Sequence, residues 1–374
     1  MRKTDTLFLT LKVFSATGGI EKVCRVAGKA LYELGGEAGN EKLQIFSLYD
    51  ESADINNKYF PAAIFTGFGK RRFSFLWSVF KEARNSRMVI LSHVNLLIVG
   101  FIIKQISPKT KLVLIAHGIE VWHSFPAWKK MMLRQCDQVL PVSDFTKNKM
   151  MELYQLPEAK MTTLNNCLDP FLPLPVQPRA NGQLLSRYGI GANDKVLLTL
   201  TRMASEERYK GYEMVMQSVY QLKEKYPCIK YLLVGKYDGA EKKRLDDIIN
   251  SLGLQQNIIL TGFIPDEEIA AHFALADLYI MPSQKEGFGI VFIEAMFYGK
   301  AVIAGNKDGS VDALKNGTFG LLVNPDSQQQ ITDAITEVIN HKEKYIPGHE
   351  AVMEHFSFPV YKEKLRRIVG QDLN

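Results

Sequence analysis

The chain has 374 residues, 46% of them hydrophobic and 23% charged, which is enough apolar material for two compact α/β domains that fold without disulfide bonds. Its four cysteines are scattered and form no C-x-x-C pair, a usage that suits a reducing compartment. The net charge is +6, and residues 1 to 185 carry 24 Lys and Arg against 15 Asp and Glu, so the amino-terminal half is the basic one. This positive charge either attracts an anionic membrane surface or a phosphate-bearing acceptor, or is simply solvated.

The first residues, MRKTDTLFLTLKVF, contain a short apolar run broken by Lys12 and no small-residue cleavage site, so they predict a first strand and not a signal peptide. The longest apolar candidate for a membrane span, Val94 to Ile103, is far shorter than the roughly 20 residues that such a helix needs. The sequence therefore predicts a cytoplasmic protein, at most peripheral at the inner face of the membrane.

Strand-like apolar runs alternate with segments of helical period, which is typical of a parallel sheet with covering helices. In the first half we expect a helix over Ile20 to Leu34 and strands at residues 5–14, 88–93, 111–117 and 138–143. The pattern restarts in the second half, with strands expected at residues 195–202, 230–235, 257–263, 278–283, 301–305 and 320–324, and helices over residues 213–226, 241–252 and 267–276. The predicted fold class is α/β, with two Rossmann-like domains in succession.

Four prolines from Pro170 to Pro178 make a helix or a central strand unfavourable there. We place the boundary near residue 182, which gives an amino-terminal domain over residues 1–182 and a carboxy-terminal domain over residues 183–357. The last segment, residues 358–374, carries Tyr361, Leu365 and Ile368 and predicts a final helix that packs away from the second sheet.

Residues 68–87 mix six basic residues with Phe73, Leu76, Trp77 and Phe80 at helical spacing. This pattern predicts either an interfacial helix on a membrane or a helix that packs on the first sheet and has basic flanks.

Ligands bind parallel sheets at the carboxyl ends of the strands, where helix N-termini favour phosphate. Gly18 and Gly19 follow the first predicted strand, and residues without side chains let backbone amides approach an anion, although a plain tight turn has the same pattern. Arg202 and Lys210 follow the strand at 195–202, where two cations can neutralise a departing diphosphate unless they are only solvated loop charges.

The segment QKEGFGIVFIEAMFYG follows the strand at 278–283. Glu286 lies in its loop, and Glu294 falls in the first turns of the next helix, between apolar neighbours where an unpaired carboxylate is costly. Because carboxylates accept paired hydrogen bonds from vicinal hydroxyls, the two acids suit a ligand with two sugar rings around a phosphate; ordinary surface acids are the plain alternative.

In this order and spacing the residues resemble the large family of retaining glycosyltransferases with the GT-B fold, of the glycosyltransferase family 4 (group 1) type, over nearly the whole chain. The resemblance implies two Rossmann-like domains that face a central cleft and a C-terminal helix that crosses back to the first domain.

The resemblance also implies a role for each matching position. The donor diphosphate would meet backbone amides of one domain and two cations of the other, at Gly18, Gly19, Arg202 and Lys210. The donor hexose would be held by Glu286 with the amides of Gly287, Phe288 and Gly289, and the ribose by Glu294. His117 matches the family's histidine over the donor sugar, with a packed strand-end histidine as the alternative, and completes a catalytic set of His117, Glu286, Arg202 and Lys210.

The chain departs from the family's pattern in three ways. Thr201 stands where a glycine usually precedes the arginine, and the spacing from Arg202 to Lys210 is long, so Arg208 is a further candidate for the phosphate. Residues 308–312, DGSVD, replace the usual G-G-x-P-E, and Ser310 is the candidate donor contact in that loop.

The predicted function is that of a metal-independent retaining glycosyltransferase, which moves a hexose from a UDP- or GDP-sugar to a glycan or lipid-linked acceptor in cell-surface polysaccharide assembly. No D-x-D lies near a strand end and no His/Cys cluster is present, so neither a metal nor another cofactor is expected, and no nucleic-acid partner. A non-catalytic nucleotide-sugar-binding subunit and an inverting GT-B enzyme are the alternatives.

Overall fold

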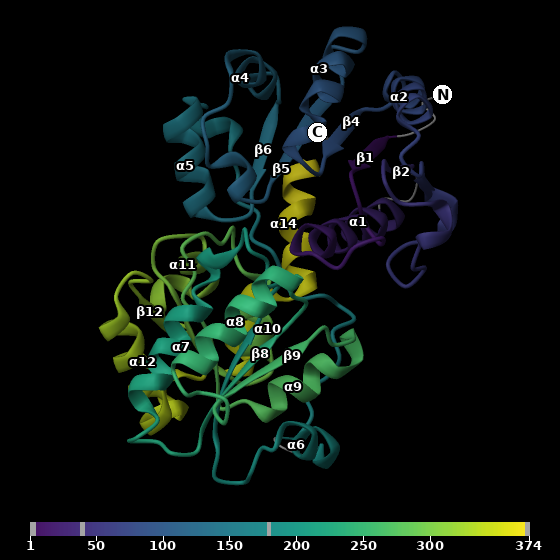
Figure 1. Ribbon diagram of the computed structural model, residues 1–374. Helices are drawn as coiled ribbons and strands as arrows, with labels where there is room; N and C mark the ends of the chain where they lie inside the picture. Colours follow the sequence, from purple (N-terminus) through teal and green to yellow (C-terminus); the bar gives the residue numbers. More distant parts are fainter. Residues whose placement is uncertain (1–4, 38–41, 178–180, 371–374) are drawn as a thin grey trace. The chain divides into compact units, whose positions relative to one another are not determined.

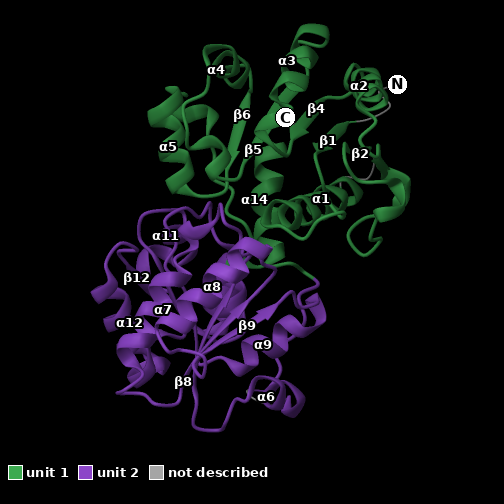
Figure 2. Cartoon of the chain, viewed as in Figure 1, with its two compact units in different colours: residues 1–170, 356–374 green, residues 171–355 purple. Residues whose placement is uncertain are grey.

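The computed structural model describes residues 5–37, 42–177 and 181–370, which form two compact units (Figures 1 and 2). Unit 1 comprises residues 1–170 and 356–374, and unit 2 comprises residues 171–355. The boundary predicted near residue 182 falls inside unit 2, at the first residue of helix α6 (Gly182–Tyr188). Pro178 of the predicted linker and residues 371–374 of the predicted final segment lie outside the described residues.

Unit 1 contains a six-stranded parallel sheet in the order β3-β2-β1-β4-β5-β6. Its strands are β1 (Thr6–Thr10), β2 (Leu43–Ser47), β3 (Phe65–Gly67), β4 (Met88–Leu91), β5 (Lys111–Ala116) and β6 (Gln138–Pro141). Its helices are α1 (Gly19–Glu37), α2 (Arg72–Ala83), α3 (Leu97–Ile106), α4 (Ala127–Arg134), α5 (Asp144–Tyr154) and α14 (Phe358–Gly370).

The strand order of unit 1 reverses between β1 and β4, so right-handed crossovers put α1 on one face of the sheet and α2, α3 and α4 on the other. Contacts agree with this division, because α3 touches both α2 and α4 while α1 packs against α14.

Unit 2 repeats the architecture with a parallel sheet in the order β12-β11-β10-β7-β8-β9. Its strands are β7 (Lys195–Leu200), β8 (Ile229–Val234), β9 (Ile258–Gly262), β10 (Leu278–Met281), β11 (Ala301–Gly305) and β12 (Leu321–Val323). Besides α6, its helices are α7 (Tyr212–Leu222), α8 (Gly239–Ser251), α9 (Ile269–Leu275), α10 (Ile290–Phe297), α11 (Ser310–Ala313) and α12 (Gln328–His341), and α13 (His349–Phe356) leads back to unit 1.

The predicted α/β class is confirmed, with two successive parallel sheets of the Rossmann type. Every strand predicted from an apolar run is present. Most are shorter than predicted by one or two residues, and β1 is shorter by five, because the last residues of several runs belong to the loops. Two strands were not predicted. β2 carries a glutamine in its five residues, and β3 is a three-residue edge strand, so neither has a long apolar run. No described helix combines the length and apolar character needed to cross a bilayer.

The predicted final helix is α14, and it contacts α1 as a helix that crosses back to the first domain must. Tyr361, Leu365 and Ile368 are buried on one face, as their spacing predicts. Lys362 Nζ lies 2.8 Å from Glu33 Oε2 and 2.9 Å from Glu37 Oε1 of α1. Apolar burial and these ion pairs together fix α14 on unit 1.

Replacement of Leu365 by alanine is expected to destabilise unit 1 by about 2–5 kcal/mol, because the side chain is 2% exposed and its removal leaves a cavity. All three tryptophans, Trp77, Trp122 and Trp128, lie in unit 1, so urea unfolding followed by tryptophan fluorescence reports on this unit. The control is Arg367→Ala on the exposed face of α14, which should change stability by less than about 0.5 kcal/mol. Equal effects of the two substitutions would contradict the packing described.

Candidate functional site

Two loops at the carboxyl edge of the unit 2 sheet are joined by an ion pair between Lys210 and Glu286. Lys210 ends a short 3-10 turn (Arg208–Lys210) between β7 and α7, and Glu286 lies between β10 and α10. Lys210 Nζ is 2.6 Å from Glu286 Oε2, and the two side chains are only 14% and 19% exposed. Burial by itself lowers the pKa of Lys210, but the Glu286 carboxylate more than offsets it, so the pKa is raised and the lysine stays a cation.

Gly211 allows these loops to approach each other. It has φ +79°, and a Cβ there would lie 2.2 Å from the carbonyl oxygen of Pro282, just after β10. Gln284 N–H also donates to Tyr209 O at 2.8 Å. Only glycine satisfies both the left-handed backbone and the close contact, which explains the Lys-Gly pair at this strand end.

The loop after β11 is locked against the loop that carries Glu286. Gly309 N–H donates to Glu286 O at 2.8 Å, and a Cβ on Gly309 would lie 2.1 Å from Gly287 O. Asp308 is fully buried and accepts hydrogen bonds from Ser283 Oγ and from Ser310 N–H. Burial raises the pKa of Asp308 to about 6, and the nearby Glu286 charge acts in the same direction.

The other two predicted phosphate-binding cations have carboxylate partners of their own. Arg202 pairs with Glu207, with its Nε 3.2 Å from Glu207 Oε2, and its side chain is 68% exposed. Arg208 Nε lies 3.5 Å from Glu241 Oε2, in a cluster that includes Arg244. The structure therefore brings Lys210 and Glu286 together, whereas Arg202 and Arg208 are bound to other acids.

The predicted Gly-Phe-Gly turn leads directly into α10. Gly289 has φ +84° and precedes the first helical residue, so free amides of the first helical turn face the same edge of the sheet. Phe288 is buried, which leaves its backbone and not its ring for a ligand. Glu294 lies in the second turn of α10 and is 1% exposed.

In unit 1 the loop after β1 places Gly18 and Gly19 at the start of α1. A Cβ on Gly19 would meet no atom of the described residues within 4 Å, whereas a Cβ on Gly18 would lie 2.4 Å from Glu21 Oε2. This helix N-terminus is therefore open to a ligand at Gly19 and has a carboxylate beside Gly18. The loop is organised by buried Asp50, whose carboxylate accepts the N–H groups of residues 13 and 15 at 2.6 and 2.7 Å. Asp50 was missed because it follows β2, a strand that the sequence did not predict.

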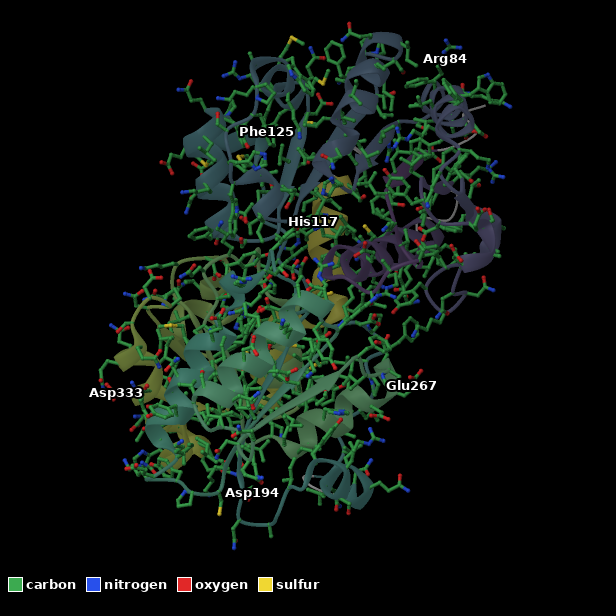
Figure 3. The ribbon with its side chains drawn as sticks, in the orientation of Figure 1. Arg84, His117, Phe125, Asp194, Glu267 and Asp333 are labelled. Carbon is green, nitrogen blue, oxygen red and sulfur yellow. The ribbon has the colours of Figure 1, made fainter. Side chains whose placement is uncertain are left out.

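His117 lies at the end of β5 (Figure 3), and His93 lies beside it after β4. His117 Nε2 is 2.6 Å from Ser92 O, and its backbone N–H donates to Glu120 Oε1 at 2.6 Å. The His93 and His117 rings stack with centroids 6.4 Å apart, and burial lowers the pKa of His93 to about 4. His93 was not predicted as a site residue, although it ends a predicted strand just as His117 does.

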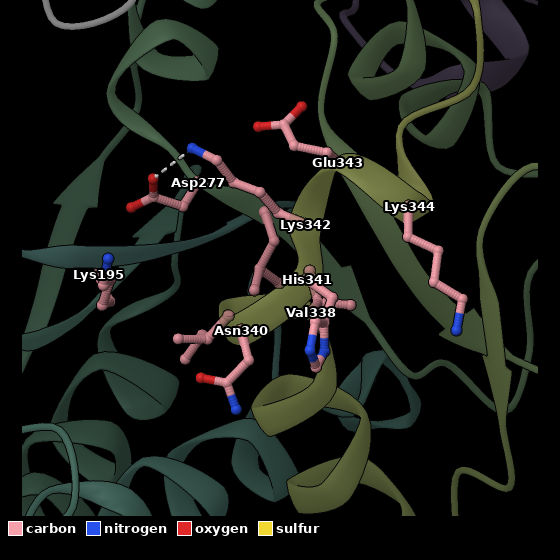
Figure 4. A pocket seen from close by; sticks show the side chains of 10 residues that line it. Lys195, Asp277, Val338, Asn340, His341, Lys342, Glu343 and Lys344 are labelled. Carbon is pink, nitrogen blue, oxygen red and sulfur yellow. Dashed lines mark hydrogen bonds and ion pairs between the residues drawn. The ribbon is translucent and has the colours of Figure 1, made fainter.

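A pocket of about 490 Å³ lies elsewhere, at the amino ends of β7 and β10 (Figure 4). It is lined by the start of these strands and by residues 338–344, and Lys342 Nζ is 3.5 Å from Asp277 Oδ1 at its wall. None of the predicted site residues lines it, so it is not the candidate site.

Two family models match the chain, one in each half. "Glycosyltransferase Family 4" matches residues 17–170, and "Glycosyl transferases group 1" matches residues 184–346. The glycine loop and His117 fall within the first match, and every predicted site residue of unit 2 falls within the second. These matches confirm the resemblance inferred from the motifs and the enzyme class that goes with it.

Curated relatives match over part of their length. A GDP-mannose-dependent alpha-(1-6)-phosphatidylinositol monomannoside mannosyltransferase of Mycolicibacterium smegmatis is 28% identical over 61% of this chain and 61% of its own length. An alpha-D-kanosaminyltransferase of Streptomyces kanamyceticus is 26% identical over 56% of this chain and 53% of its own. The aligned regions thus span about half to three fifths of these relatives.

Solved structures match over nearly the whole chain. HepE of Anabaena, solved in complex with UDP, has a TM-score of 0.82 with 19% identity and covers 98% of this chain and 100% of its own. WaaG, a glycosyltransferase involved in lipopolysaccharide biosynthesis, has a TM-score of 0.67 with 16% identity over 97% and 99% of the two chains. This likeness confirms the predicted GT-B fold.

Asp308 makes the stability of unit 2 depend on pH. Its pKa is about 6 in the folded chain and about 3.9 in an unfolded one, so the folded state holds this proton more tightly and loses stability as the pH rises through 6. Asp308→Asn abolishes this titration. The stability of the variant relative to the native chain should therefore rise by about 1–1.5 kcal/mol from pH 5 to pH 8, whatever the offset from its altered hydrogen bonds. Calorimetric unfolding at both pH values measures it, and a difference that does not change with pH would be the contrary result.

Proposed function

Because the chain belongs to the glycosyl transferases group 1 family, whose members retain the configuration of the transferred sugar, we propose that it moves a hexose from a UDP- or GDP-sugar to a glycan or lipid-linked acceptor in cell-surface polysaccharide assembly. The observation that carries the proposal is the Lys210–Glu286 pair, which holds a cation and a carboxylate side by side at the carboxyl edge of the unit 2 sheet.

Unit 2 holds the donor. Negative charge grows on the diphosphate as the glycosidic bond breaks, and fixed cations in a partly buried site stabilise it without reorganisation. Lys210 is charged and immobilised by Glu286, and the exposed guanidinium of Arg202 reaches the same diphosphate by exchanging Glu207 for phosphate oxygens. Arg208, which is paired with Glu241, is a further cation for the diphosphate.

The two glutamates bind the two sugar rings of the donor. Glu286 uses one oxygen for Lys210 and accepts the N–H of Gly287 at 3.1 Å, and further lone pairs of its carboxylate accept hexose hydroxyls. Glu294 accepts the ribose hydroxyls from the second turn of α10, and Ser310 adds a contact from the loop that Asp308 fixes.

Unit 1 supplies the remaining groups. The amides of Gly18 and Gly19 meet the diphosphate once the Glu21 carboxylate beside Gly18 has moved aside, and His117 contacts the donor sugar from the end of β5. The Ser92 carbonyl oxygen accepts a hydrogen bond from His117 Nε2–H, which leaves Nδ1 as the ring nitrogen available to the sugar. This nitrogen accepts a hydrogen bond from a sugar hydroxyl.

The reaction proceeds by front-face displacement. Glu286 is held in an ion pair and is a poor nucleophile, so the acceptor oxygen attacks the anomeric carbon on the face from which the diphosphate departs, through an oxocarbenium-like state. The bond to the diphosphate breaks, a departing phosphate oxygen takes the acceptor proton, and the new glycosidic bond keeps the configuration of the donor.

The relatives support both the donor and the acceptor that we propose. The mycobacterial relative is named for a GDP-mannose donor and a phosphatidylinositol monomannoside acceptor, and HepE was solved with UDP. A lipid-linked acceptor places the enzyme at the inner face of the membrane, in contact through its basic unit 1.

UDP- or GDP-sugars should raise the melting temperature of the purified chain, since a ligand stabilises the state that binds it. Lys210→Ala and Glu294→Ala should abolish the shift, and Lys210→Ala should lower kcat/KM by about 10²–10³ because it removes a cation from the leaving group. The matched control is Lys225→Ala, an exposed lysine after α7, which should leave both quantities unchanged.

Each contrary outcome of this experiment has its own meaning. No shift with any nucleotide would refute the donor site, and a shift kept in both variants would refute the residue assignments. A shift without transfer to any glycan or lipid-linked acceptor would favour a non-catalytic subunit, and inverted configuration at the product's anomeric proton would show an inverting enzyme.

A further inference from the structure

Helix α2 buries one face and leaves an aromatic and basic stripe on the other. Phe75, Val79 and Ala83 lie in the core of unit 1, so the helix packs on its sheet as one of the two sequence interpretations proposed. Phe73 is nevertheless 91% exposed and Trp77 is 67% exposed. They are four residues apart and so lie on the same face of the helix, where large rings in water are unfavourable.

Basic side chains surround this stripe. Lys70, Arg71, Arg72, Lys81 and Arg84 are all exposed, and Arg84 is labelled in Figure 3. Lys81 Nζ lies 5.1 Å from the centre of the Trp77 ring. In residues 70–136 there are twelve Lys and Arg against two acids, Glu82 and Glu120. Two of these cations have acidic partners outside this range, Arg71 with Glu51 and Lys104 with Asp137, and the charge that remains is still positive.

The neighbouring helices on this face of the sheet also expose apolar side chains. Ile98 of α3 is 51% exposed, and Trp128 and Met131 of α4 are 55% and 47% exposed. α3 contacts both α2 and α4, and neither α3 nor α4 contains an acidic residue. The surface that we call the α2–α4 face therefore combines exposed apolar side chains on three helices with the positive charge of α2 and α4.

We infer that the α2–α4 face binds the surface of an anionic lipid bilayer. Aromatic rings are favoured at the level of the headgroups, and each Lys or Arg near an anionic leaflet adds to the attraction. Phe73 and Trp77 enter the interface, and the basic residues contact lipid phosphates. The inference deepens the proposed function by naming the surface that meets a lipid-linked acceptor, but it rests on features of unit 1 and not on transfer.

The test is flotation of the full-length chain with vesicles of phosphatidylcholine alone or mixed with phosphatidylglycerol, without any sugar nucleotide. We expect binding to the anionic vesicles only, and weaker binding at high salt. The Phe73→Ala/Trp77→Ala variant should bind at least tenfold more weakly, as should Arg72→Gln/Lys81→Gln/Arg84→Gln. Brominated lipids should quench the tryptophan fluorescence of the bound native chain, which requires ring insertion.

The matched control is Tyr220→Ala in unit 2, another exposed ring with a lysine above it, at 4.6 Å from Lys223 Nζ. This variant should bind vesicles like the native chain. Equal binding to neutral vesicles, no loss in the α2 variants, or retention of a short RNA but not of vesicles would overturn the inference. Donor binding measured on the same variants distinguishes this failure from failure of the proposed function, because the α2–α4 face includes no proposed donor residue.

Discussion

The ion pair between Lys210 and Glu286 is the constraint on which the candidate donor site depends. It joins the loop after β7 to the loop after β10, and these strands are neighbours in the unit 2 sheet. Neither side chain can be removed without leaving the other charge partly buried and unpaired, which is costly. Gly211 and Gly309 permit the backbone contacts that bring the loops together, so the pair and the glycines specify one arrangement. The same arrangement keeps Lys210 cationic where we propose that the donor diphosphate binds.

Much of this could be predicted from the sequence, because the fold and the motifs are both local patterns. Long apolar runs gave nearly all strands, and the carboxyl edge of a parallel sheet is where Lys210, Glu286 and His117 had to lie. What could not be predicted depends on contacts distant in sequence. The Asp50 carboxylate accepts hydrogen bonds from the backbone N–H groups of residues 13 and 15, and Arg202 pairs with Glu207 only when the loop that carries both has folded. The raised pKa of Asp308 arises from burial among loops that meet only in the folded unit.

The two halves of the chain differ in net charge. Residues 1–185 are basic, whereas residues 186–374 carry 22 Lys and Arg against 25 Asp and Glu. In the acidic half the candidate donor-binding cations Arg202, Arg208 and Lys210 are paired with carboxylates, so the donor that we propose would meet particular cations and not an overall positive charge. In the basic half the positive charge of α2 and α4 faces solvent together with Phe73, Trp77 and Trp128. One half thus suits a small nucleotide and the other a large anionic surface.

Amide hydrogen exchange with and without a UDP- or GDP-sugar reports where the donor binds on the chain without presuming the chemistry. If the donor binds at the Lys210–Glu286 pair, we expect slower exchange for residues 286–293, before and at the start of α10, and for residues 209–212. Residues 338–344, at the pocket on the opposite edge of the sheet, should not change. Protection confined to residues 338–344, with none around Glu286, would contradict the account.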